Sequence, residues 1–136
     1  MQTKKGEAGR RLAEELGAYK GLRGVILISP QEGVSSGFRV GWELRMPVEP
    51  LFESQVPVEG LVVIIVQDEI TNGYVLGRMI EGLQEQHPTK VVVAALSSTR
   101  KAAAVLSYIA DEMVVLEIVE GNAISHPDPV PAWLMS

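Results

Sequence analysis

Acidic residues stand where a run of apolar residues gives way to a helical pattern. Residues 62–66 are all Val or Ile, and Gln67, Asp68 and Glu69 follow them directly. A Thr-Asn-Gly sequence comes soon after, and apolar residues then recur at helical spacing. Carboxylates accept hydrogen bonds from hydroxyl groups, and the first backbone N–H groups of a helix attract anions. We therefore expect the 67–75 corner, where a strand turns into a helix, to bind a ligand.

The composition excludes several classes of protein. The chain has 136 residues, a net charge of −5 and no cysteine, so it forms neither a disulfide framework nor a thiolate zinc site. Its 12 Lys and Arg residues are dispersed, which argues against binding to nucleic acid. No apolar run approaches the ~18 residues of a membrane span, and the first residues are charged and helical, so we expect a cytoplasmic protein. A hydrophobic fraction of 46% favours a homodimer, in which a second copy covers apolar surface.

The alternation of patterns predicts an α/β fold. Apolar runs indicate buried strands at 24–29, 60–67, 90–97 and 112–119, and a weak edge strand rich in Pro at 47–54. Helical spacing occurs at 7–19, 74–86 and 98–110, and more loosely, through Val34, Phe38 and Leu44, across 32–46. In 74–86 the spacing predicts an inner face of Val75, Met79, Ile80 and Leu83. Such alternation predicts a three-layer α/β/α sandwich around a mainly parallel five-stranded sheet. We assign residues 1–120 to this domain and 121–136 to a Pro-rich C-terminal tail.

The fold class predicts where a ligand would bind. In parallel sheets the crevice lies beyond the carboxyl ends of the strands, where the strand order reverses. The loops after 24–29 and 60–67 are therefore expected to flank it. The second of these loops is the 67–75 corner.

The sequence "VVIIVQDEITNGYVL" resembles the phosphoribosyl-pyrophosphate motif of the type I phosphoribosyltransferases. That motif has four apolar residues, two acids, two mostly apolar residues and a turn rich in Thr, Ala and Gly that opens a helix. "ILISPQEGVSSGFRVGWEL" stands where the family has its pyrophosphate loop and a helix, and residues 90–117 resemble its late strand–helix–strand. The resemblance covers roughly residues 8–118. It implies a phosphoribosyltransferase-like fold, a phosphorylated or nucleotide-like ligand, and Mg²⁺ as cofactor if the protein is active.

In that family the two acids bind the ribose hydroxyls, and the loop after them binds the 5′-phosphate. By resemblance Asp68 matches the second acid, while Gln67 replaces the first and lacks its charge. Glu69 could serve as a second acid if the turn is shifted. The positions that correspond to the phosphate loop are Thr71, Asn72, Gly73, Tyr74 and Val75, of which the last two are larger than usual.

Other departures argue against ordinary transfer activity. In the pyrophosphate loop, Gln31 stands where the family usually has a basic residue. The acidic Glu32 follows it and precedes Gly33. Two like charges ~4 Å apart repel by ~4 kcal/mol at an effective dielectric constant of about 20, so Glu32 opposes a pyrophosphate. The family also carries a long, basic catalytic loop before the motif strand. Here residues 53–60 connect the two strands without Lys or Arg.

Structural roles compete with these functional ones. Gly73 would supply backbone freedom to the turn, and Thr71 or Asn72 would cap the helix. Ser35 and Ser36 are expected to cap or pack a helix rather than act as nucleophiles. Ser98, Thr99 and Arg100 could contact an anion, although capping is the simpler role. Two isolated histidines make no metal site.

Three functions remain open on the evidence of the sequence. The chain is a phosphoribosyltransferase-like binding protein with weak or absent transfer, an active phosphoribosyltransferase on an unknown base, or a structural or regulatory dimerisation module. For the first we expect no measurable phosphoribosyl transfer. We also expect an anion to bind at the N–H groups of residues 71–75. Replacement of Gly73 by a β-branched residue should then abolish this binding and leave the fold intact.

Overall fold

The computed structural model describes residues 4–29, 34–51 and 56–120. Its sheet has five parallel strands in the order β2-β1-β3-β4-β5. The strands are β1 Gly24–Ile28, β2 Val48–Pro50, β3 Val62–Ile70, β4 Lys90–Thr99 and β5 Glu112–Val119. The helices are α1 Lys4–Glu15, the short 3₁₀ helix η1 Gly17–Tyr19, α2 Val34–Leu44, α3 Gly73–Gln84 and α4 Arg100–Ile109.

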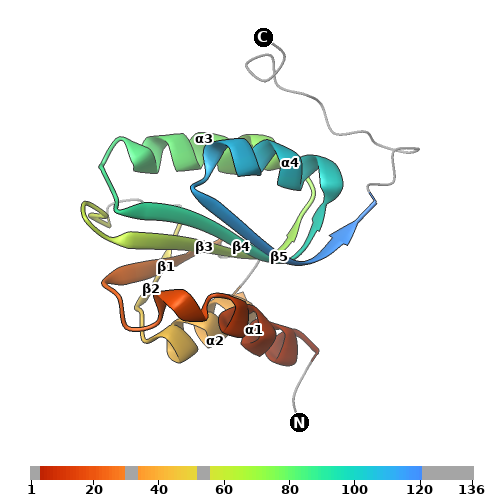
Figure 1. Cartoon of the computed structure of the whole chain (residues 1–136), viewed down its shortest axis with the longest axis horizontal. Coiled ribbons are helices and arrows are strands. Elements are labelled where there is room, and N and C mark those ends of the chain that lie inside the picture. Colours follow the sequence, from red (N-terminus) through yellow and green to blue (C-terminus); the bar gives the residue numbers. More distant parts are fainter. Residues whose placement is uncertain (1–3, 30–33, 52–55, 121–136) are drawn as a thin grey trace.

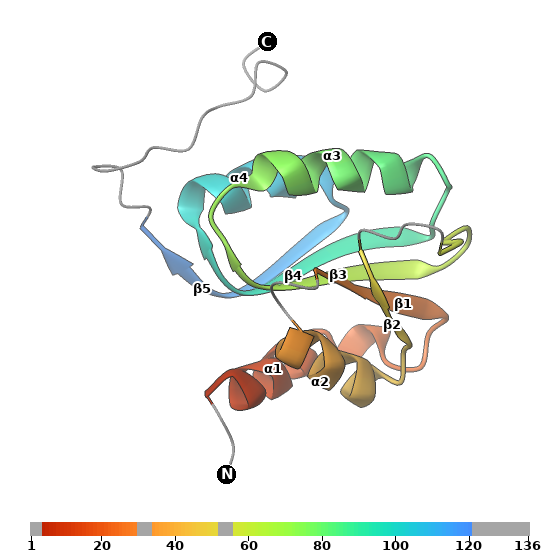
Figure 2. The same cartoon turned by 180° about the vertical axis from the view of Figure 1, so that it is seen from behind.

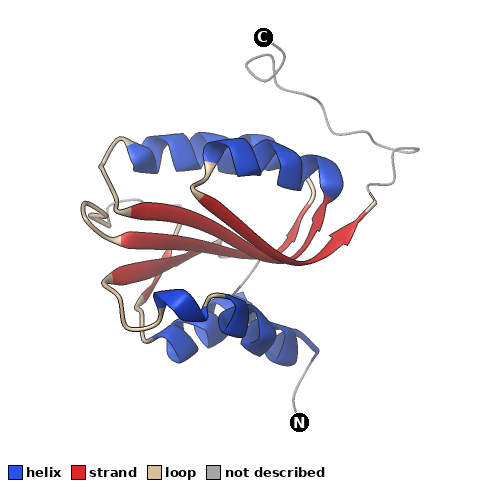
Figure 3. Ribbon diagram, in the orientation of Figure 1, coloured by secondary structure: helices blue, strands red, loops and turns tan. Residues whose placement is uncertain are grey.

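The helices form two layers, one on each face of the sheet. Helices α1 and α2 lie below the sheet in Figure 1, and α3 and α4 lie above it. Figure 3 shows the same three layers by type of structure. The predicted α/β/α sandwich with a parallel five-stranded sheet is therefore confirmed.

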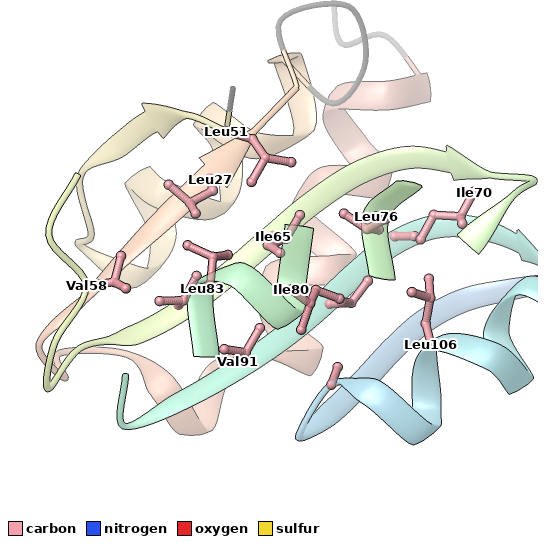
Figure 4. Close-up of a cluster of buried hydrophobic side chains, with 14 of the residues drawn as sticks. Leu27, Leu51, Val58, Ile65, Ile70, Leu76, Ile80, Leu83, Val91 and Leu106 are labelled. Atoms are coloured by element: carbon pink, nitrogen blue, oxygen red, sulfur yellow. The ribbon is translucent and has the colours of Figure 1, made fainter. Parts of the chain in front are cut away.

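Each face of the sheet has its own hydrophobic core. Residues such as Ile26 and Ile64 pack against Leu12 and Leu44 of α1 and α2. On the other face, Ile65 packs with residues of α3 and α4, among them Leu76, Ile80, Leu83 and Leu106 (Figure 4). Central strand β3 is buried from Val62 to Val66, which explains why its sequence is uniformly apolar.

The chain crosses the sheet between its second and third strands. After β1 it adds β2 on one side, and β3 then pairs with β1 on the other side. The carboxyl ends of β1 and β3 therefore flank the point where the strand order reverses, as predicted. Edge strand β2 is short and ends at Pro50, in agreement with the weak edge strand expected from its prolines.

The two central strands extend beyond their apolar segments. Strand β3 continues through Asp68 and Glu69 to Ile70, three residues past the predicted end, and β4 continues to Thr99. Backbone pairing joins Glu69 to Ser97 and Ile70 to Ser98. Because the backbone forms these bonds whatever the side chain, the hydrophobic pattern underestimates the strand length.

Helix α2 packs on the sheet through its glycines. A Cβ atom on Gly37 would lie 2.1 Å from Ile28 Cγ2, and one on Gly41 would lie 2.5 Å from Val48 Cγ2. These glycines allow the helix to approach the strands closely, so they belong to its buried face. Val34 and Phe38, in contrast, are exposed.

Within the described ranges, no helix has the length and apolar character that crossing a bilayer requires.

Candidate functional site at the carboxyl ends of β1 and β3

Asp68 lies near the carboxyl end of β3 and is held by a residue from another element. The Oγ atom of Ser36 in α2 donates a hydrogen bond to Asp68 Oδ1, with a distance of 2.6 Å. Ser36 is fully buried, whereas Asp68 is half-buried. The hydrogen bond fixes the carboxylate on the α2 side of the sheet, next to the point where the strand order reverses.

The neighbouring polar residues lie differently. Successive side chains of a strand point to opposite faces, so this alternation directs Gln67 away from the α2 side. Gln67 is half-buried and Glu69 is exposed. The idea that Glu69 replaces the missing acid in a shifted turn is therefore not supported, because β3 runs through Glu69 in register with β4.

The turn between β3 and α3 consists of Thr71 and Asn72, both of which are exposed. Asn72 is the N-cap of α3, and its Oδ1 atom accepts a hydrogen bond from the Tyr74 N–H at 2.8 Å. The predicted cap is therefore present. An anion at this helix start would have to displace the Asn72 side chain to reach the Tyr74 N–H.

Gly73 has a packing role that the sequence does not indicate. It is the first residue of α3 and is buried, and its φ lies outside the left-handed region that favours glycine. A Cβ atom here would lie 3.1 Å from Leu106 Cγ in α4. A β-branched residue here would press on Leu106, so the prediction that the fold stays intact depends on whether that side chain can move by a few tenths of an ångström.

Tyr74 and Val75 occupy the exposed side of the first turn of α3. Tyr74 is 39% exposed and Val75 is 58% exposed. The periodicity of 74–86 had predicted Val75 on the inner face together with Ile80 and Leu83. That placement was wrong for Val75, because Leu76 takes the buried position in this turn.

Gln31, Glu32 and Gly33, the predicted pyrophosphate-loop residues, lie outside the described residues. They follow β1 in the chain, and β1 pairs with β3 from Gly24–Val62 to Ile28–Val66.

The join between β4 and α4, which we call the 97–102 corner, lies beside the 67–75 corner at the same edge of the sheet. Ser98 and Thr99 are buried. Ser98 Oγ donates to the Thr99 carbonyl at 2.9 Å, and Thr99 Oγ1 accepts from the Ala102 N–H at 3.1 Å. The capping role expected for Thr99 is therefore confirmed.

Arg100 forms an ion pair with Glu120, the residue that directly follows β5. Its Nη2 atom lies 2.6 Å from Glu120 Oε1. This hydrogen bond and the positive charge lower the pKa of Glu120. Both side chains are exposed, so the pair contributes little to stability.

The described residues offer no ready metal centre. In the ranges 4–29, 34–51 and 56–120, no three His, Asp or Glu side chains gather closely enough to hold an ion.

Ser36 is the residue of this site whose role sequence reasoning missed. The sequence predicted a cap or a small packing residue in α2, and Ser36 is indeed buried. The available signal was the Ser-Gly pair at 36–37, which allows close packing of a helix. It did not identify Asp68 as the partner, 32 residues away.

Comparisons with known proteins agree with this architecture. No protein-family model matches the sequence, and neither does any curated protein. Among solved structures, TT1426 from Thermus thermophilus is 18% identical, with a TM-score of 0.75 over 85% of this chain and 83% of that one. A hypoxanthine-guanine-xanthine phosphoribosyltransferase is 21% identical, with a TM-score of 0.66 over 86% and 74%.

A third similar structure contains a nucleotide. A hypothetical protein from Neisseria gonorrhoeae with bound ppGpp is 15% identical, with a TM-score of 0.65 over 85% of this chain and 77% of that one. Purine and orotate phosphoribosyltransferases also match. The sheet order, the layers and these similarities together show that the chain has the fold of the type I phosphoribosyltransferases.

Proposed function

We propose that the protein binds a phosphorylated, nucleotide-like ligand at the carboxyl ends of β1 and β3, with weak or absent phosphoribosyl transfer. The observation that supports this most directly is the position of Asp68. A half-buried carboxylate, oriented by Ser36, stands at the edge where ligands bind in open α/β sheets. The ppGpp bound to a protein of the same fold is consistent with a nucleotide-like ligand.

The expected roles follow from the chemistry of the residues. Asp68 accepts a hydrogen bond from a ribose hydroxyl. The start of α3 attracts the phosphate, with Thr71, Asn72 and the N–H groups of Gly73 to Val75 around it. Because Tyr74 N–H already donates to Asn72, phosphate binding includes an exchange of this cap. Glu69 and the pyrophosphate-loop residues Gln31, Glu32 and Gly33 remain candidate contacts.

Weak transfer is proposed from what the sequence lacks. Gln67 carries no charge where the family has an acid, and Glu32 adds a negative charge where pyrophosphate would leave. Residues 51–61, between β2 and β3, contain no Lys or Arg. The transition state of transfer is cationic and sensitive to water. In this chain it has no basic lid, which would exclude water and contact the pyrophosphate, and it lacks the usual pair of carboxylates.

A transfer assay tests this part of the proposal. With phosphoribosyl pyrophosphate and Mg²⁺, addition of hypoxanthine, guanine, uracil or orotate should not increase the release of pyrophosphate. Release that depends on one of these bases would instead support the alternative, an active phosphoribosyltransferase.

Ligand binding is tested by isothermal titration of ribose 5-phosphate and of inorganic phosphate. The Asp68→Asn variant keeps an oxygen that accepts from Ser36 but removes the charge. Hydrogen bonds to charged groups contribute about 1.5–3 kcal/mol, so affinity for ribose 5-phosphate should fall roughly tenfold or more. Affinity for inorganic phosphate should not change.

Glu117→Gln is the matched control, since Glu117 is an exposed carboxylate near the end of β5. This variant should bind ribose 5-phosphate as the parent does. A parent that binds neither probe would leave the structural or regulatory dimerisation module as the remaining function.

We also propose that the chain forms a homodimer. Large apolar side chains remain exposed in the single chain, among them Phe38 and Trp42. Burial of such side chains against a second copy would remove this area from water.

A further inference from the structure

The two edges of the sheet are protected differently. Edge strand β2 has three residues, ends at Pro50 and is preceded by Pro47, and proline lacks the N–H group that an added strand would need. Strand β5 forms the other edge (Figure 2) and runs for eight residues, Glu112–Val119, without Pro, Lys or Arg. Natural proteins seldom leave a long, regular edge strand open to further pairing. We therefore expect a cover for this edge.

Every second backbone unit of β5 faces away from β4. In a strand, the N–H and C=O groups of successive residues point to opposite sides. Strand β4 pairs with one side of β5, from Val92–Glu112 to Thr99–Val119. Within residues 4–29, 34–51 and 56–120, no strand pairs with the other side. The outward groups form a row, which we call the β5 edge, and an additional strand would satisfy them.

The side chains of β5 are also only partly covered. Met113 and Val115 pack against the core under α3 and α4, and Val114 and Leu116 pack against the core on the other face. All four are only half-buried, and Ile118 is 42% exposed. An extended segment beside β5 would remove apolar surface from water on both faces of the sheet.

A second copy of the same strand is a poor partner for the β5 edge. Glu112 and Glu117 are exposed on β5, and the exposed Glu120 follows it. Two β5 strands paired about a two-fold axis would gather three carboxylates from each copy, although Lys90 and Arg100 pair with two of the three. Like charges opposite one another in paired strands are destabilising. The cover is therefore expected from a segment with few acids.

The segment that follows β5 has the pattern of a strand with one blocked side. Pro127, Pro129 and Pro131 occupy every second position. Because alternate residues of an extended segment direct their N–H groups to the same side, the prolines remove the donors from one side only. Asp128 and Val130 keep theirs on the other side. Such a segment can pair through its complete side, while its proline side prevents further pairing.

This segment also starts in the right place and is long enough. Residues 121–136 lie outside the described residues, and they follow Glu120, which Arg100 holds through a 2.6 Å contact. A strand of eight residues is about 26 Å long, and residues 121–126 span up to about 20 Å. These residues are sufficient for the chain to reverse direction and bring Val130 beside β5.

We infer that residues 127–131 pair antiparallel with the β5 edge as a sixth strand, with their prolines facing away from the sheet. The complete side, with the N–H groups of Asp128 and Val130, bonds to the outward groups of β5. The proline side closes the sheet to further strands, as Pro47 and Pro50 do at β2. This inference concerns a different part of the molecule from the 67–75 corner, so it does not depend on the proposed ligand.

Hydrogen exchange in the full chain, measured for each amide by NMR, tests the pairing. In the parent, successive N–H groups from Met113 to Leu116 should all exchange slowly. Val130→Pro removes a donor from the pairing side, so the outward groups should exchange about tenfold faster or more. Fast and slow amides should then alternate along β5. Val130→Ala is the matched control, because it keeps the N–H group and should exchange as the parent does.

A second experiment tests the role of the prolines. Replacement of Pro127, Pro129 and Pro131 together by Ala gives the outward side of the segment its N–H groups and leaves the pairing side unchanged. The variant should keep the slow exchange along β5. It should also form species larger than those of the parent in sedimentation velocity, with increased thioflavin T fluorescence, because a further strand can now be added.

Each outcome supports or overturns part of the inference. Fast and slow amides that already alternate in the folded parent would overturn it, because the β5 edge would then be open. Slow exchange that persists in Val130→Pro would also overturn it, and a loss of protection on dilution would identify a second copy as the cover. A triple proline variant that loses the slow exchange, or keeps the size of the parent, would overturn the role of the prolines in closing the sheet.

Discussion

The 67–75 corner and the 97–102 corner occupy equivalent places in neighbouring strand–helix units, but their polar residues are used differently. Backbone pairing of Ile70 with Ser98 holds the two corners side by side. At the 97–102 corner, buried Ser98 and Thr99 bond to the backbone within three residues. At the 67–75 corner, Asp68 is fixed by Ser36, 32 residues away, and Glu69, Thr71 and Asn72 are exposed.

The difference suggests how one fold separates stability from binding. Local hydrogen bonds occupy the polar side chains of a buried corner and leave few of them for a ligand to contact. A half-buried carboxylate oriented by a distant element, beside exposed polar residues, is instead suited to receive a ligand without rearrangement of the backbone. We therefore expect substitutions at the two corners to have different consequences.

The largest difference is expected between the two fully buried serines. Ser36→Ala removes a hydrogen bond to a carboxylate, which should lower the free energy of unfolding by about 1.5–3 kcal/mol. Ser98→Ala removes a hydrogen bond to a carbonyl and should cost about 0.5–1.5 kcal/mol. Urea denaturation of both variants measures these values. Equal costs would mean that the distant partner gives Asp68 no special support.

An effect of similar size is expected at Gly73. Gly73→Val adds a side chain whose Cβ lies 3.1 Å from Leu106 Cγ, and such overpacking should lower the free energy of unfolding by about 1–3 kcal/mol. Gly82→Val is the control, because it lies in the same helix and a Cβ there meets no atom within 4 Å. If thermal unfolding finds Gly73→Val as stable as this control, the glycine serves the turn rather than the packing of α3 on α4.

The sequence predicted the sheet better than it predicted the site, for a physical reason. Strands buried on both faces need uniformly apolar residues, so β1, β3 and β4 were apparent from runs such as 62–66. The role of Gly73 depends on how closely α3 meets α4, and the Ser36–Asp68 bond depends on how closely α2 meets β3. These distances arise from packing between elements, and no local pattern records them.

Exposure also explains the error at Val75. The helical period correctly placed Ile80 and Leu83 in the core, but the first turn of α3 begins at a buried Gly73, which places Leu76 rather than Val75 inward. Periodicity identifies a face of a helix, whereas the start of the helix fixes which residues of the first turn belong to it. The proposed phosphate contacts lie in that turn, so their placement was the least predictable part of the site.

The smallest expected difference concerns the two helix caps. Thr99 is buried and caps α4, so Thr99→Ala should lower the free energy of unfolding by about 1 kcal/mol. Asn72 is exposed, and water can replace it at the Tyr74 N–H, so Asn72→Ala should cost about 0.5 kcal/mol. If an anion binds at the start of α3, saturating phosphate should offset the loss in Asn72→Ala but not in Thr99→Ala. Thermal unfolding of both variants with and without phosphate, at constant ionic strength, measures this contrast, and an equal response in the two variants would show that the start of α3 is no more an anion site than the start of α4.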